Sequence, residues 1–109
     1  MLRLKPGVRL TDLAPQMAVV LEVVPQAYRE AGARDCTITS ANDGKHKVGS
    51  LHYSGRALDF RTRDLDELGI DVLVLLVAIR DALGENFDCL LEDRYGSNEH
   101  LHVEYDPEE

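Results

Sequence analysis

Basic residues are scarce in this sequence. It has 12 Lys and Arg against 20 Asp and Glu, which gives a formal net charge of −8. It contains no basic run and no basic patch interleaved with aromatic residues. Nucleic acid and anionic membrane surfaces are therefore not expected as partners, because both are negatively charged.

Long apolar runs are lacking as well. The longest, Val72 to Ile79, is far shorter than the roughly 20 residues that a membrane-spanning helix needs. The stretch Met1–Gly7 lacks the continuous apolar segment of a secretory signal. We therefore expect the chain to be cytoplasmic on synthesis, so that any action outside the cell would require release or delivery by another route.

Cysteine is rare, and the two cysteines form no CxxC pair. Cys36 and Cys89 each fall among apolar residues of an expected strand. This placement is typical of small buried apolar side chains. A disulfide or a role in binding metal is the alternative.

The pattern of apolar residues predicts one domain over 1–109, without repeats or linkers. Helical spacing covers 15–31, where Pro25 predicts a kink or two shorter helices, and 72–83, which Gly84 closes. Alternating or β-branched segments predict four strands, at 36–39, 56–62, 87–92 and 100–105.

These elements predict an α+β fold in which helices pack on one face of a small, mainly antiparallel sheet. A short turn at 95–98 joins the last two strands, which favours their antiparallel pairing. Residues 1–13 are expected to form an extended arm, and 40–49 a polar loop. The polar side chains of the strands would then carry a zinc site on the open face.

The stretch Ser50–Asp59 is the first half of this candidate site. It separates His52 from Asp59 by seven positions, with Gly55 between them. A glycine turn allows both side chains to converge on one point. Asp59 also faces away from the core side of its strand, where Leu58 points, as a ligand on the open face must.

The second half lies near the end of the chain. His100 and His102 share the polar face of the last strand, because strand side chains alternate. Glu99 stands three residues before His102, and a carboxylate beside a metal-bound water can act as a general base. His46 lies just upstream of the first half. A lone histidine is more often structural, but two clusters with acidic neighbours predict a metal centre.

The motif Ser50-x-His52-x-x-Gly55-x-Ala57-x-Asp59, followed by His100-x-His102, resembles the zinc signature of the D-alanyl-D-alanine peptidase and hedgehog superfamily. The similarity covers roughly residues 36–105. This superfamily includes D,D-carboxypeptidases, vancomycin-resistance D,D-dipeptidases, phage endolysins that cut L-alanyl-D-glutamate bonds and the hedgehog amino-terminal signalling domain.

The resemblance implies Zn²⁺ as cofactor, with His52, Asp59 and His102 as its ligands. It implies that Glu99 is the catalytic base, because Glu99 matches the Glu-x-x-His pattern of the peptidases. His46 and His100 would lie beside the metal and stabilise an oxyanion.

The expected function is that of a zinc metallopeptidase that hydrolyses the stem peptides of peptidoglycan. An endopeptidase is favoured over a D,D-carboxypeptidase, because residues 40–43 lack the arginine with which many carboxypeptidase members hold the substrate carboxylate. The alternative is a non-catalytic, zinc-stabilised binding or assembly module of the hedgehog-like fold. The sequence makes no prediction about the oligomeric state.

Overall fold

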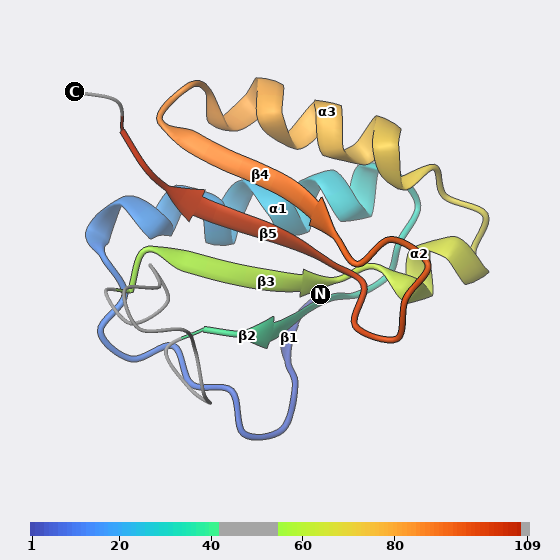
Figure 1. The fold of residues 1–109 in the computed structure, drawn as a ribbon, viewed down its shortest axis with the longest axis horizontal. Helices are drawn as coiled ribbons and strands as arrows, with labels where there is room; N and C mark the ends of the chain where they lie inside the picture. The colour runs from blue at the N-terminus through green and yellow to red at the C-terminus, as the bar shows by residue number, and fades with distance from the viewer. Residues whose placement is uncertain (42–54, 108–109) are drawn as a thin grey trace.

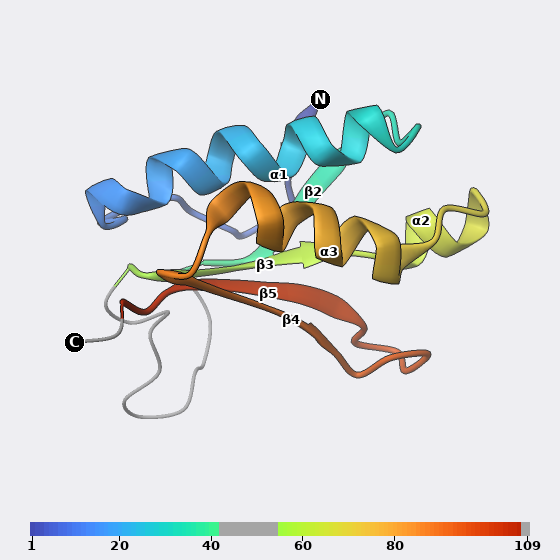
Figure 2. The ribbon, with the colours of Figure 1, turned by 90° about the horizontal axis from the view of Figure 1, so that it is seen from above.

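Five strands form a mixed sheet that carries its two longer helices on one face (Figures 1 and 2). The computed structural model describes residues 1–41 and 55–107. The strands lie in the order β1-β2-β3-β5-β4. Their bounds are β1 Leu2–Leu4, β2 Cys36–Ser40, β3 Ala57–Arg61, β4 Phe87–Glu92 and β5 His100–Tyr105. The strands expected from the sequence are therefore confirmed, and the last two pair antiparallel as predicted.

The amino-terminal arm makes the sheet mixed rather than mainly antiparallel, so that part of the expected fold was wrong. Strand β1 pairs in parallel with β2, with Leu2 opposite Cys36. The intervening helix returns the chain to the same end of the sheet, which a parallel pairing requires. Three residues are too few to give an alternating pattern, so the strand has no signature in the sequence.

Helix α1 (Ala18–Glu30) follows the 3₁₀ turn η1 (Pro15–Met17) and runs without interruption through Pro25. The expected division into two short helices is therefore not found. Val20, Val24 and Tyr28 line its buried side, and their packing on the sheet offsets the hydrogen bond that proline removes. Tyr28 also donates a hydrogen bond of 2.7 Å to the backbone oxygen of Arg61.

Helix α3 (Val72–Leu83) begins where predicted, because the Asp71 carboxylate accepts hydrogen bonds from the amides of Leu73 and Val74. A short helix, α2 (Arg63–Glu67), precedes it. The core lies between the helices and the inner face of the sheet; the sheet contributes Ile38, Leu58, Phe60, Leu101 and Val103, among others. Among the helices that the structure describes, none is long and apolar enough to cross a membrane.

Both cysteines are buried and neither forms a disulfide, which confirms the prediction of small buried side chains. Cys36 lies in β2 and Cys89 in β4. Burial raises the pKa of the Cys36 thiol to about 12 and that of Cys89 to about 11. Thiols with such pKa values stay protonated at neutral pH and are poor metal ligands and nucleophiles.

Candidate metal centre

The pairing of β3 with β5 brings together two residues that lie 43 positions apart in the chain. Asp59 is directly opposite His102, and Arg61 is opposite His100. Leu58 and Phe60, the neighbours of Asp59 in β3, point into the core. Asp59 and, through the register, both histidines therefore lie on the sheet face that the helices leave open. The faces predicted from strand alternation are therefore correct.

Each ring nitrogen of His102 lies beside a carboxylate. Nδ1 lies 2.8 Å from Oδ1 of Asp59, and Nε2 lies 2.9 Å from Oε1 of Glu104. Metal-binding histidines commonly donate one N–H to an acceptor of this kind, which fixes the ring and presents the other nitrogen to the ion. Glu104 occupies that orienting position, and Nδ1 faces the potential ligand Asp59.

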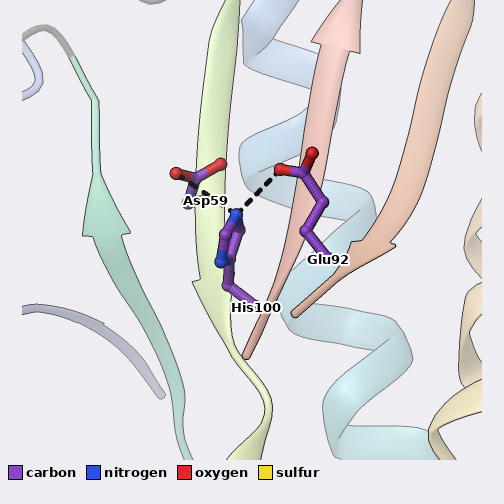
Figure 3. A group of neighbouring side chains, drawn as sticks. All are labelled: Asp59, Glu92 and His100. Carbon is purple, nitrogen blue, oxygen red and sulfur yellow. Dashed lines mark hydrogen bonds and ion pairs between the residues drawn. The ribbon is translucent and has the colours of Figure 1, made fainter. Parts of the chain in front are cut away.

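His100, two residues before His102 in β5, is held in a similar way. Its Nδ1 lies 2.6 Å from the backbone oxygen of Asn98, an atom that can only accept a hydrogen bond, so Nδ1 carries a proton. Its Nε2 points between two carboxylates, 2.9 Å from Glu92 and 3.7 Å from Asp59 (Figure 3). Nε2 is therefore placed either to share a proton with these carboxylates or to bind a metal ion together with them.

Asp59, Glu92 and His100 offer three ligand atoms that all lie within 4.8 Å of one another (Figure 3). Two ligand atoms on one tetrahedral zinc ion are about 3.3 Å apart. The 2.8 Å between His102 and Asp59 and the 3.7 Å between His100 and Asp59 lie on either side of that value. Imidazole nitrogen and carboxylate oxygen are also donors that zinc accepts. The described residues therefore fit a metal centre built around Asp59.

The carboxylates around His102 stabilise its charged form. Burial alone would lower the pKa of this histidine, but the hydrogen bond and the negative charge of Asp59, followed by Glu104 and Glu92, outweigh it. Together they raise the pKa of His102 to about 9. At neutral pH the ring is therefore the charged imidazolium in the metal-free protein, with a proton on each nitrogen. A metal ion that binds at Nδ1 would have to displace the proton there.

Glu99 is not brought together with these residues. Its carboxylate accepts hydrogen bonds from Thr62 Oγ1 at 2.6 Å, from the Tyr95 amide at 2.7 Å and from Arg94 at 3.1 Å. Its side chain is only 3% exposed. Burial would raise the pKa of Glu99, but these hydrogen bonds prevail and lower it. A carboxylate with these partners anchors the turn between β4 and β5 to the start of α2, and it is poorly placed to take a proton from water.

Two of the predicted site residues, His46 and His52, lie outside the described residues. Gly55, which the sequence assigns to a turn between His52 and Asp59, has a φ of +72°. A Cβ atom at this position would clash with the backbone oxygen of Asp12, and the Gly55 oxygen accepts a hydrogen bond from the Ala14 amide. Only glycine suits this backbone conformation and this close approach.

Sequence reasoning missed Glu92 and Glu104. Strand alternation places Glu104 on the same face as His100 and His102, so a signal for it was present. Glu92 joins the cluster because it lies opposite His100 in the β4–β5 pair. That position depends on the register of the pair and on the length of the turn, which the sequence pattern does not define.

The model of the hedgehog amino-terminal signalling domain matches residues 24–104 of this chain. The match begins within α1 and ends one residue before the end of β5, so it includes Asp59, Glu92 and both histidines of β5. It covers well over half of the sequence. The chain therefore belongs to the hedgehog amino-terminal signalling domain family.

Proposed function

We propose that this protein is a zinc-dependent peptidase that cleaves stem peptides of peptidoglycan, as an endopeptidase rather than a D,D-carboxypeptidase. One observation supports the zinc centre: His100 and His102 each have one nitrogen beside an oxygen acceptor, while the other nitrogen lies near Asp59, at 2.8 Å for His102 and at 3.7 Å for His100, whose Nε2 is also 2.9 Å from Glu92. The choice of substrate comes from the zinc-peptidase resemblance of the sequence motif, and membership of the hedgehog family is compatible with it.

The proposed ligands are His52, Asp59 and His102. Bound zinc would polarise the substrate carbonyl and lower the pKa of a coordinated water. Glu104 holds the His102 ring so that Nδ1 faces Asp59. Loss of such an orienting acceptor weakens metal binding by about 10- to 100-fold in other proteins.

We assign proton transfer to Glu92 and His100 instead of Glu99. The Glu92 side chain is 47% exposed and its carboxylate lies 2.9 Å from His100 Nε2. One proton shared between these two atoms can be passed to a leaving amine after a second is taken from water. Glu99 lacks this access because its oxygens already accept hydrogen bonds from Thr62, Tyr95 and Arg94.

The second candidate is a non-catalytic, zinc-stabilised binding or assembly module. Two observations favour it. The family model that matches is that of a signalling domain. The carboxylate of Glu99, the base that the peptidase resemblance implies, already accepts hydrogen bonds from Thr62 and the Tyr95 amide. Both candidates involve bound metal, so metal analysis alone does not distinguish them.

The test is mass spectrometry of muropeptides after incubation with zinc-loaded protein. A peptidase should release stem-peptide fragments, and Glu92→Gln should reduce the rate by about 100-fold or more, within the range of a lost general base. Glu92→Gln should still bind zinc. If the wild type releases no fragment while it retains zinc, the enzyme hypothesis fails and the binding module is favoured.

Zinc affinity should depend steeply on pH. Because the pKa of His102 is raised to about 9, each bound ion must displace a proton, so the association constant should rise about tenfold per pH unit from pH 6 to about 9. In the metal-free protein the sign is opposite: the stability that protonated His102 provides is complete below about pH 6.5 and is lost as the pH rises through about 9.

Chelator competition at several pH values measures the zinc affinity. Glu104→Gln retains an acceptor for Nε2 but removes a charge that raises the pKa of His102. In this variant the zinc affinity should therefore stop rising at a lower pH than in the wild type. An affinity that is constant from pH 6 to 9 would contradict the assignment of His102 as a ligand.

A further inference from the structure

A groove of about 850 Å³ runs between α1 and α3, on the face of the molecule opposite the metal centre. Figure 2 shows these helices side by side above the sheet, so their outer surfaces are covered by no other element that the structure describes. Apolar side chains make up much of its lining, with Val23 and Ala27 from α1 and Val74 and Ala78 from α3.

Helix α3 is more apolar than its packing requires. Its inner side is formed by Val72, Leu75, Leu76 and Ile79, which are buried. Its outer side carries Leu73, Val74 and Val77, which are 56%, 66% and 54% exposed. A helix on the surface of a soluble protein usually has polar residues there, and exposed apolar side chains gathered on one helix typically mark an interaction site. Of these three, Val74 lines the groove, and Leu73 and Val77 lie beside it on the same helix.

The charges around the groove are of one sign. Glu22, Glu30 and Asp71 line it, and none of the described lining residues is Lys or Arg. The whole chain carries a net charge of −8. An acidic rim disfavours fatty acids, anionic membranes and nucleic acid, and it also disfavours a second copy of the same acidic surface.

We propose that the α1–α3 groove binds an amphipathic helix of a partner protein, one with an apolar stripe flanked by Lys and Arg. Helices α1 and α3 are 13 and 12 residues long, which is about 18–20 Å at 1.5 Å per residue. A helix of three to four turns, with apolar residues at i, i+3, i+4 and i+7, matches this length and the apolar floor. Its basic flanks would face Glu22 and Glu30.

The probe is a synthetic 14-residue peptide, which is about four helical turns, with leucine at those positions and lysine on the flanks, compared with the same peptide carrying glutamate in place of lysine. Calorimetry with the full chain should detect binding of the lysine peptide, with the glutamate peptide about tenfold weaker or worse, as expected when several surface charge pairs change sign. Val74→Lys, at an exposed position, should weaken the lysine peptide by about tenfold or more.

A matched pair of variants tests the site. Glu22→Lys with Glu30→Lys should weaken binding of the lysine peptide about tenfold, whereas Asp88→Lys with Asp106→Lys, the same change of charge outside the groove, should leave it within about twofold. Equal losses in both variants, equal binding of both peptides, or no binding would overturn the proposal. A dimer in sedimentation analysis that Val74→Lys dissociates would make a second copy the occupant and would also overturn it.

Discussion

Asp59→Ala is expected to weaken zinc binding by more than about 100-fold. Losing an orienting group costs about 10- to 100-fold, and Asp59 is itself a proposed ligand. It is also the residue that both histidines of β5 face, with Oδ1 2.8 Å from His102 and Oδ2 3.7 Å from His100. Equilibrium dialysis with zinc, or competition with a chromogenic chelator, measures this loss.

The same substitution has a second readout that needs no metal. The hydrogen bond and charge of Asp59 are the main favourable causes of the raised pKa of His102. Asp59→Ala should therefore lower that pKa from about 9 toward 6.5, which NMR titration of the imidazole detects. Asp81→Ala, a change at an exposed position of α3 on the other face of the sheet, is the control and should leave zinc affinity within about twofold. Unchanged zinc affinity in Asp59→Ala would remove Asp59 from the ligand set.

Glu99→Gln is expected to destabilise the fold by about 2–4 kcal/mol, the range for losing buried hydrogen bonds to a charged group. The variant loses the charge that Arg94 and the Tyr95 amide contact, and it presents an amide N–H₂ to some of these donors. The turn between β4 and β5 should loosen from Thr62 at the start of α2. For a domain of this size the melting temperature should fall by about 10–20 °C.

Acid should reproduce part of this effect. Because the pKa of Glu99 is lower in the folded protein than in the unfolded chain, its contribution is present above about pH 4.5 and is lost as the pH falls through the folded pKa. The wild type should therefore lose stability below about pH 4.5, and Glu99→Gln should lose less over the same interval. Thermal unfolding at a series of pH values measures both.

Glu92→Gln is the matched partner of Glu99→Gln, since the chemical change is identical and the Glu92 side chain is 47% exposed. We expect the free energy of unfolding of Glu92→Gln to lie within about 1 kcal/mol of the wild-type value, as is usual for a substitution at an exposed position. If instead Glu99→Gln remains as stable as the wild type and alone abolishes hydrolysis, Glu99 is the base that the sequence pattern predicts, and our assignment to Glu92 is wrong.

Local patterns in the sequence determined the elements and their faces. Period-two alternation identified β4 and β5, and helical spacing with Gly84 identified α3. The same alternation placed Asp59 on the face opposite Leu58, and His100 and His102 on one face of β5. These features depend on residues within a few positions of each other, so sequence reasoning could predict them. Of the two outcomes that it left open at Pro25, a kink or two short helices, the second does not occur, because α1 continues through Pro25.

Only the tertiary structure decided which strands pair and which of their residues lie side by side. The parallel pairing of β1 with β2 depends on where α1 returns the chain, and no short pattern encodes that. Register placed Glu92 opposite His100 and Asp59 opposite His102. The turn before β5 directed Glu99 inward to Thr62, although its spacing from His102 matches a catalytic base. The sequence alone thus determined that Asp59 lies on the polar face of its strand and His100 and His102 on that of theirs. The pairing and register of β3, β5 and β4 decided that these residues meet and which carboxylates surround them, because register joins residues that are distant in the chain.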